Sequence, residues 1–537
     1  MNSIKKYVVL LVFIAGIFAS CTDYLETQPT DQVSGTTLFQ DVSSANTAIQ
    51  GVYSVLWNST PATGNQHQAV GFQSTLLAQD MMGDDAVMTT FDFYIWDYNL
   101  DYFRQLSTGN QGTASRNYNV WAMMYYLIAN LNYIIAAEDV IGGNPDEVKN
   151  IIAQAYAMRA FCYFELIQMY QFTYLGNENK PGVPIYTEPT RAGDQGKPRG
   201  TVTDVYTLIN SDMKRAIEIF EEIANVSDDD ELIPLVQKHC SMVDYYVAKG
   251  FEARIALVQG RWQDAYNAAE EARKRPGSRL LNTTAEITGG LSRYSLPSTL
   301  WAMEVIVDQS HIFAGLYNAL DGRASYGSRS RKCVSRWLYD RIANPMFSDI
   351  RSQWFLAPEH GAAVTGVNVN YGQMKRRYHT ETNWTGDFIF MRTEEMLLIQ
   401  AEAQARLGNY GEARALLIQL SDVRMTTAEG RTAYSDYLSS LANAATMPEL
   451  TNVDPTNVLE EVILQRRIEM WGEIGRIKDI LRLKQGYDRD YPGSNHVEKA
   501  IAANTTKPEN GAFLFKIPQT EIDGNENITT EDQNPTN

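Results

Sequence analysis

The sequence predicts a predominantly α-helical protein in which helical hairpins form a scaffold and a loop-rich part adds short strands. Two observations lead to this fold class. Apolar residues recur at helical spacing along several stretches, and a helix–turn–helix pattern with a glycine at the turn occurs twice. Loop-rich stretches interrupt the helices at 58–112, 172–200, 282–387 and 431–456. Because functional residues concentrate in loops held by a rigid frame, we expect a binding site there.

The N-terminus carries the pattern of an export signal followed by a lipid anchor. Two lysines precede an apolar stretch at 8–19, which fits a signal-peptide core and is too short to span a bilayer. Two small residues then precede Cys21 in a sequence similar to a bacterial lipobox. We therefore expect 1–20 to be a lipoprotein signal peptide, Cys21 to be acylated and 21–42 to be a tether. The alternative is an ordinary signal peptide followed by an incidental cysteine.

The following stretches predict long helices that pair with one another. Apolar residues recur at helical spacing within 48–57 and within 118–140. A third helix at 146–170 begins after Pro145, which is a helix start signal. We expect 146–170 to pair with 206–220, and 118–140 to pair with 48–57.

Two further segments share an internal repeat. The segments 250–272 and 397–417 superpose on Gly260 and Gly408, and each glycine is followed two positions later by an aromatic residue. Small residues allow the two helices to approach, glycine permits a tight turn, and the aromatic ring fills the crossing. This chemistry is tetratricopeptide-like.

Composition excludes several classes of function. The chain has 537 residues and a net charge of −18, so nucleic acid, which requires a basic face, is not expected as a partner. The sequence has no nucleophile elbow, phosphate-binding loop or metal-spaced histidines, so we expect no catalytic residue, cofactor or metal. If Cys21 is lipidated, three cysteines remain, which argues against a disulfide framework. Cys162 and Cys240 lie among apolar helical positions and are expected to pack in the core.

Several sequence blocks, in this order, resemble the SusD/RagB family of surface glycan-binding lipoproteins over nearly the whole chain. The blocks are CTDYLETQP, IIAQAYAMRAFCYFELIQMY, VYTLINSDMKRAIEIF, TGDFIFMRTEEMLLIQAEAQARLGNYGEA, VILQRRIEMWGEIGRIKDILRLK and FLFKIPQTEIDGNENITTEDQNP. The resemblance implies a SusD-like fold and a binding protein rather than an enzyme. It also implies a lipid anchor on the extracellular face of the outer membrane. The implied ligand is an oligosaccharide or polysaccharide, and the implied partner is a SusC-like TonB-dependent transporter.

This resemblance divides the mature chain into two regions. Residues 43–285 form an N-terminal tetratricopeptide-like region and 286–537 a C-terminal SusD/RagB region, in which 388–425 adds a further hairpin to the scaffold. Charged residues lie between apolar helix faces in the C-terminal region, and we expect them to form partly buried ion pairs that fix the packing of the helices. They are Arg392, Glu394, Glu395, Arg466, Glu469, Arg476 and Asp479.

The stretch 80–110 has the densest combination of residues suited to a sugar. A sugar ring offers a face of C–H groups and a rim of hydroxyls, so a site needs exposed flat rings and charged hydrogen-bonding groups. Alternation at 91–96 predicts a short strand that buries one set of side chains and turns Tyr94, Trp96 and Tyr98 outward. The ligand-binding residues predicted here are Trp96, the first candidate, with Tyr94, Tyr98, Asp84, Asp85 and Arg104.

A second cluster, at 311–332, is rich in glycine. It adds the predicted ligand-binding residues Tyr317, Arg323 and Tyr326, and Trp354 is a weaker candidate. Its basic end is either a solvated loop that balances nearby acids, a site for an anionic glycan, or a docking patch for the transporter. That end consists of Arg323, Arg329, Arg331, Lys332 and Arg336. By contrast, we expect Trp121, Trp262 and Trp471 to lie in the core because they occupy apolar helix stripes.

Two other functions stay open. Some relatives are thought to capture peptides, so a RagB-like peptide receptor is one alternative. A surface glycoside hydrolase or lyase is the other, because only three-dimensional separation reveals a catalytic carboxylate pair. For a single oligosaccharide we expect weak affinity, on the order of micromolar to millimolar, because shallow polar sites gain only a small surplus over the costs of binding.

Overall fold

The computed structural model describes residues 39–58, 71–90, 94–100, 116–191, 193–226, 237, 239–309, 315–358, 369–380 and 385–535. Helices dominate these residues, and the strands are short and occur in two-stranded sheets. The predicted fold class is therefore confirmed. Residues 1–38 lie outside the described residues. They include the predicted signal peptide, Cys21 and most of the predicted tether.

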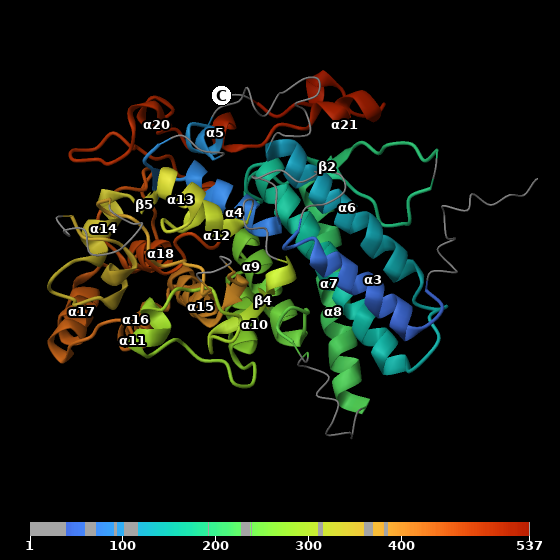
Figure 1. Cartoon of the computed structure of the whole chain (residues 1–537), viewed down its shortest axis with the longest axis horizontal. Coiled ribbons are helices and arrows are strands. Elements are labelled where there is room, and N and C mark those ends of the chain that lie inside the picture. The colour runs from blue at the N-terminus through green and yellow to red at the C-terminus, as the bar shows by residue number, and fades with distance from the viewer. Residues whose placement is uncertain are drawn as a thin grey trace, which may run out of the picture.

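Four long helices form the N-terminal part of the scaffold. They are α3 (Val42–Ser54), α6 (Arg116–Ala136), α7 (Pro145–Tyr170) and α8 (Val202–Val226). Helix α7 packs against α6 and α8, and α3 packs against α6 and α7, which confirms both predicted pairs. Figure 1 shows these helices together at one end of the molecule. The start of α7 is fixed by Asn144, whose side chain accepts a hydrogen bond from the N–H of Asp146.

The two repeated segments form helical hairpins that stack on each other. Helices α9 (Tyr245–Gln259) and α10 (Trp262–Arg273) make the first, and α15 (Thr393–Arg406) and α16 (Tyr410–Ser421) make the second. Gly260 and Gly408 have φ angles of 71° and 82°, a left-handed conformation that glycine adopts without steric cost. Helix α10 packs against α15. The predicted hairpins and their glycine turns are confirmed.

Two helices of twelve or more residues lie in stretches that the sequence predicted to be rich in loops. Helix α4 (Gly71–Met82) lies within 58–112, and α17 (Ala428–Ser440) covers the beginning of 431–456. Every residue of α4 is buried, and some of its polar side chains have hydrogen-bond partners inside the protein; the amide of Gln73, for example, donates to the carbonyl of Ile389 at 2.7 Å. The loop prediction was wrong for α4 because periodicity reveals a helix only when one of its faces meets water.

The loop-rich segments are tied together by three small antiparallel sheets. The pairs are β1 (Ala86–Met88) with β5 (Lys332–Val334), β2 (Pro181–Pro184) with β3 (Arg199–Thr201), and β4 (Thr299–Met303) with β6 (Phe388–Arg392). Two C-terminal helices, α18 (Val458–Glu469) and α19 (Arg476–Arg482), pack against α15 and α4 respectively. The shorter elements are α5 (Ile95–Tyr98), α11 (Thr284–Thr288), η3 (Val307–Gln309), α12 (Leu316–Leu320), α13 (Ser325–Arg329), α14 (Arg336–Ile342), η4 (Ile350–Trp354), α20 (Glu498–Ala502), η5 (Gly511–Phe513), α21 (Gln519–Gly524) and η6 (Thr530–Asp532).

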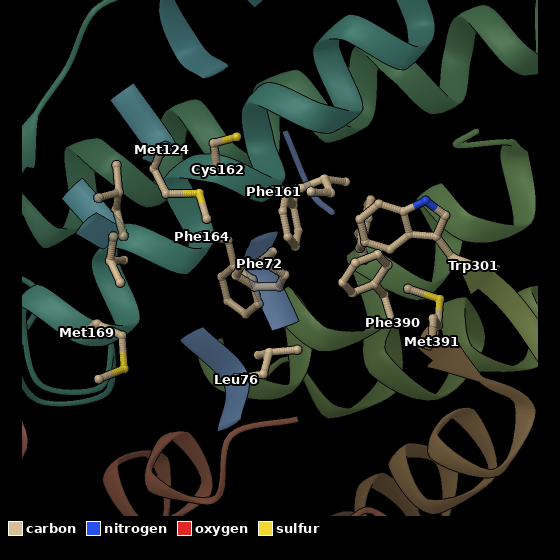
Figure 2. Close-up of a cluster of buried hydrophobic side chains, with 14 of the residues drawn as sticks. Phe72, Leu76, Met124, Phe161, Cys162, Phe164, Met169, Trp301, Phe390 and Met391 are labelled. Atoms are coloured by element: carbon tan, nitrogen blue, oxygen red, sulfur yellow. The ribbon is translucent and has the colours of Figure 1, made fainter. Parts of the chain in front are cut away.

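The main hydrophobic core lies where α4, α7, β4 and β6 meet. Figure 2 shows Phe72 and Phe161 from the helices beside Trp301 and Phe390 from the strands. The ring centroids of Phe72 and Phe161 are 5.2 Å apart, and those of Trp301 and Phe390 are 4.7 Å apart, separations at which aromatic pairs attract each other. This core draws on both halves of the chain, and a second cluster lies among α15, α16, α17 and α18.

The residues predicted to form ion pairs do so inside the protein, in several groups, one of which is centred on Glu469. All seven residues predicted for it are buried. The carboxylate of Glu469 accepts from Arg351 at 3.2 Å, from Arg392 at 3.2 Å and from Arg424 at 3.0 Å. Although burial alone would raise it, the neighbouring Arg392 and Lys375 lower the pKa of Glu473 to about 2. These charges therefore hold β6, α15 and α18 in register, as predicted.

The cysteines of the described residues are free thiols. They are Cys162, Cys240 and Cys333. Cys162 and Cys333 are buried, and Cys240 is partly buried, so packing rather than pairing accounts for them; burial raises the pKa of the Cys333 thiol to about 12. Within the described part of the chain, no helix has both the length and the apolar character to cross a membrane.

Candidate functional site

The structure places the two predicted rim acids, Asp84 and Asp85, inside the protein. Asp84 is fully buried and Asp85 is 3% exposed. The guanidinium of Arg467 lies 2.9 Å from Asp84 and 2.6 Å from Asp85, and Arg476 lies 3.0 Å from Asp84. Thr451 donates a further hydrogen bond to Asp84. The predicted exposed role of both acids is wrong, because α18 and the start of α19 supply partners that no local pattern could indicate.

The described end of the strand predicted at 91–96 is a turn of helix, and 91–93 lie outside the described residues. Residues Ile95–Tyr98 form α5, and Tyr94 and Tyr98 are buried rather than turned outward. The Tyr98 hydroxyl lies 2.9 Å from His496 Nδ1, and Arg489 lies over the Tyr98 ring. Their predicted outward orientation is therefore wrong. The side chain of Trp96 and the whole of Arg104 lie outside the described residues, so their contact with a ligand stays a prediction.

The second predicted cluster is also largely internal. Tyr317 is buried and donates to the carbonyl of Asp387 at 2.8 Å, and Trp354 is buried and donates to the carbonyl of Ile287 at 2.7 Å. Neither presents a ring to solvent, which corrects their predicted role as exposed stacking surfaces. Arg323 is half-buried, pairs with Asp321 at 2.7 Å and lies 4.0 Å over the ring of Tyr378.

Arg323 therefore stays a candidate at the edge of this region. Tyr326 belongs to α13, and its side chain lies outside the described residues. The basic end of the cluster does not form one exposed patch, because Lys332 is buried and its ammonium donates to the carbonyl of Ser330 at 2.9 Å. Arg329 is exposed, and Arg336 pairs with Asp340 at 3.5 Å.

A different part of the molecule carries an open cleft. The cleft has a volume of about 690 Å³ and lies between α6, the segment 186–197 that follows β2, and α21. In Figure 1, α21 lies beside the end of α6 near β2. The volume falls in the range of small-ligand sites, roughly 300 to 1,000 Å³.

One wall of the cleft is aromatic. Tyr118, Trp121 and Tyr125 lie on one face of α6 because their spacing of three and four residues brings them round the helix to the same side. Tyr186 completes the wall from the β2–β3 connection. The ring centroids of Trp121 and Tyr125 are 4.8 Å apart, and those of Tyr125 and Tyr186 are 5.8 Å apart at an interplanar angle of 85°. The rings therefore support one another in fixed positions.

Much of the remaining lining of the cleft is polar, and part of it is hydrogen-bonded to the aromatic wall. Trp121 donates from Nε1 to Glu521 at 3.2 Å, and Asn525 donates from Nδ2 to Glu521 at 2.8 Å. Asn525 also donates to the carbonyl of Lys197 at 2.9 Å. Glu188, Asp194 and Lys197 lie along the segment 186–197. The C-terminal helix α21 is thus held against α6 through groups that themselves line the cleft.

Two tyrosines of the wall, Tyr125 and Tyr186, stay uncharged over the physiological range because their pKa values are raised. Burial, with further contributions from Tyr163 and Glu521, raises the pKa of Tyr125 well above its usual value. Burial and Glu521 also raise the pKa of Tyr186. A neutral aromatic wall facing a charged and amide-bearing rim matches the two faces of a sugar ring, apolar C–H groups and hydroxyls.

Sequence reasoning did not find this cleft as a site. It placed Trp121 in the core, which is confirmed because Trp121 is 5% exposed, yet Trp121 also lines the cleft. Two signals were available: the aromatic spacing at 118, 121 and 125, and the prediction that the loop-rich stretch 172–200 carries function. The part of the cleft formed by α21 is distant in sequence, because Trp121 and Glu521 are 400 positions apart.

The described residues hold no group of three or more histidine, cysteine, aspartate or glutamate side chains placed to bind a metal ion. The carboxyl groups with a raised pKa lie elsewhere, inside the scaffold. Burial raises the pKa of Asp80 on α4 to about 7, and burial also raises the pKa of Asp212 on α8, which pairs with Arg159 at 2.7 Å. Neither residue lines the cleft.

Comparison with known proteins places this architecture in a known family. Residues 23–229 match a SusD-like family described as starch-binding and associating with the outer membrane, and residues 359–536 match the SusD family. Two such models of one family, in the expected order, cover most of the chain. The class of protein that this fold and these matches define is the SusD-like helical-hairpin protein.

The chain belongs to the SusD/RagB family. A SusD-like protein P38 from Formosa agariphila is 23% identical over 423 residues, covering 70% of this chain and 74% of that protein. SusD-like protein P25 from the same organism is 21% identical, covering 88% and 89%. Among solved structures, a SusD-like carbohydrate binding protein from Bacteroides vulgatus has a TM-score of 0.71 at 22% identity, covering 93% of this chain and 99% of that one. A SusD superfamily protein from Bacteroides thetaiotaomicron has a TM-score of 0.70 at 21% identity, covering 92% and 100%.

Proposed function

We propose that this protein is a cell-surface lipoprotein that binds oligosaccharide or polysaccharide and delivers it to a SusC-like TonB-dependent transporter in the outer membrane. The observation that carries the binding half is the cleft, in which a fixed wall of four aromatic rings faces a rim of carboxylates, a lysine and amides. Membership of the SusD/RagB family supports the association with the outer membrane.

The cleft suits binding and release better than covalent chemistry. The carboxyl groups that burial holds at a raised pKa, the usual property of a general acid, are inside the scaffold and do not reach the cleft. Glu521 accepts hydrogen bonds from Trp121 and Asn525 on both oxygens, which fits a positioning role. We therefore propose a receptor without catalytic residues.

The anchoring half of the proposal rests on Cys21. The lipobox-like sequence before it predicts acylation, and one acyl chain binds membranes only marginally, whereas two or more anchor stably. Replacing Cys21 by Ser should move the full-length protein from the membrane fraction to the soluble fraction of the cell. Retention of Cys21→Ser in the membrane fraction would show that something other than this acylation holds the protein there.

Binding is tested by retardation of the purified chain, from residue 22 on, in native gels cast with a panel of polysaccharides. We expect at least one polymer to retard the wild-type protein. We expect Tyr186→Ala to abolish that retardation, because removing this half-buried ring leaves the aromatic wall incomplete. Tyr410→Ala is the matched control, because Tyr410 is also half-buried but begins α16, away from the cleft.

The same gels separate the cleft from the predicted platform at 80–110. Loss of retardation in Trp96→Ala but not in Tyr186→Ala would place the ligand at that platform. Retardation by no polymer, together with binding of extended peptides in a separate titration, would replace glycan capture by peptide capture.

A further inference from the structure

The charges that line the cleft are strongly unequal. Among the described residues of its lining, the ionisable groups besides tyrosine are the acids Glu188, Asp194 and Glu521 and the single base Lys197. The chain as a whole carries a net charge of −18. A ligand that enters the cleft therefore meets negative charge at short range and at long range.

Three of these four charges, those of Glu521, Asp194 and Lys197, are held by contacts within the protein. Glu521 is held between Trp121 and Asn525, and Asp194 accepts a hydrogen bond from the backbone N–H of Arg191 at 2.6 Å. The ammonium of Lys197 lies 5.5 Å from the centroid of the Tyr186 ring, so the one positive charge is drawn onto the aromatic wall. The acids are thus set to accept hydrogen bonds from a ligand, and the lysine alone could offset an anion.

From this arrangement we infer that the cleft takes an uncharged, hydroxyl-rich glycan and rejects glycans that carry carboxylate or sulfate groups; this inference rests on the proposed glycan-binding function. Sugar hydroxyls donate to carboxylates in charge-assisted hydrogen bonds, which are stronger than those between neutral groups. A uronate or sulfate on the same ring would instead place like charges opposite each other with one lysine to compensate, and like-charge juxtaposition is a strong element of specificity.

The inference is tested with a pair of ligands that differ only in charge. The probes are one neutral polysaccharide that retards the wild-type protein and the same polysaccharide with its primary hydroxyls oxidised to carboxylates. We expect the oxidised polymer to bind at least tenfold more weakly at low salt, and the difference to shrink as salt rises because screening weakens the repulsion. Equal or tighter Tyr186-dependent binding of the oxidised polymer would overturn the inference while leaving glycan binding intact.

Reversing the charge of one acid that lines the cleft, Glu188, provides a second test of the inference. Glu188 is exposed, so Glu188→Lys should fold normally and should recover roughly fivefold or more of the lost affinity for the oxidised polymer, through attraction in place of repulsion. Glu270→Lys, an exposed position on α10 outside the cleft, makes the same change in net charge and should recover almost none. Equal recovery by both variants would mean that net charge, not the cleft, sets the preference, and would contradict the inference.

The remaining outcomes also decide the question. Retardation by no polysaccharide in the panel would overturn both the proposed function and this inference. Retardation by a neutral polymer that Tyr186→Ala does not affect would leave glycan binding standing and would remove the cleft as its site.

Discussion

The cluster around Asp84 and the cleft around Trp121 are built from similar residues but have opposite exposure. In the Asp84 cluster, aspartates lie beside Tyr98, His496 and Trp471, and the whole group is buried. In the cleft, carboxylates lie beside Trp121 and three tyrosines, and the space between them is open. The Asp84 cluster resembles a binding site in the sequence, whereas the residues of the cleft resemble core.

Charge balance explains the difference. Asp84 and Asp85 meet Arg467 and Arg476, so each negative charge has a guanidinium within 3.0 Å. A buried charge is tolerated when it is paired and hydrogen-bonded. The cleft has three acids and one lysine, and closing the protein over an unbalanced set would cost more than leaving it hydrated. A surplus of negative charge therefore favours a hydrated cleft, whereas acids matched by arginines can be buried.

The largest difference in stability is expected when one carboxylate charge is removed from the buried Asp84 cluster and, for comparison, one from the open cleft. Asp84→Asn should lower the free energy of unfolding by about 3–5 kcal/mol, because it leaves Arg467 and Arg476 buried with too little negative charge. Glu188→Gln in the cleft should change it by no more than about 0.5 kcal/mol. Chemical denaturation of the two variants measures both values, and similar losses would refute the contrast between a closed and an open cluster.

A pH effect should follow from His496, which lies in the closed cluster. Burial, together with the charge of Arg489, lowers the pKa of His496 to about 3 from an ordinary value of 6.5. The unfolded chain therefore binds a proton first as the pH falls, so this residue's contribution is intact above pH 6.5 and is lost progressively down to pH 3, at up to about 1.4 kcal/mol per pH unit.

The check is the difference between two pH series of unfolding free energies, one for the wild type and one for His496→Gln. Other groups titrate in both proteins and largely cancel in this difference. Tyr186→Ala, which alters the open cleft, should retain the wild-type slope between pH 6.5 and 3. Parallel curves for the wild type and His496→Gln would show that the imidazole titrates normally in the folded state.

Two tryptophans offer a smaller and more selective comparison. Trp121→Phe removes the donor to Glu521, and Trp471→Phe removes the donor to the carbonyl of Asp85. Each should cost about 1 kcal/mol of stability, the usual net value of a hydrogen bond. Only Trp121→Phe should also weaken ligand binding, by a few-fold in titration with the retarding glycan. An equal effect of Trp471→Phe on binding would mean that the two regions are coupled.

The smallest expected effect concerns Lys197. Lys197 is exposed, and its ammonium lies over the Tyr186 ring; such a contact at an exposed site contributes about 0.5–1 kcal/mol. Lys197→Gln should lower the thermal midpoint only slightly, and it should weaken the binding of the oxidised glycan further because the last positive charge of the cleft is gone. Stronger binding of the oxidised glycan by this variant would contradict the charge argument.

Much of the scaffold could be predicted because its signals are local. The glycines at 260 and 408, the long apolar stripes and the charges between apolar faces each define their structure within a few turns of helix. Helix α4 could not be predicted in this way, since burial on every side erases the amphipathic pattern. The short α5 was mistaken for a strand because alternation over six residues fits both periods poorly.

The candidate site was harder to predict because its parts are distant in sequence. The cleft combines a helix near residue 120, a connection near 190 and a helix near 521, and only the fold brings them together. Asp84 and Asp85 were wrongly predicted to bind ligand for the same reason. The arginines that neutralise Asp84 are Arg467 and Arg476, which lie near the other end of the chain. Trp96 and Arg104 keep their predicted role until binding experiments address them.

The pairing of Asp84 with Arg467 and Arg476 also determines when the protein can fold. The partners are 383 and 392 residues apart, and contacts of such long range form slowly because a large loop must close first. A chain that is synthesised from its N-terminus must leave Asp84, which follows α4, without these partners until α18 and α19 have been made. The growing chain therefore depends on protection from aggregation until α18 and α19 have been synthesised, and a product truncated before them would leave Asp84 without its arginine partners.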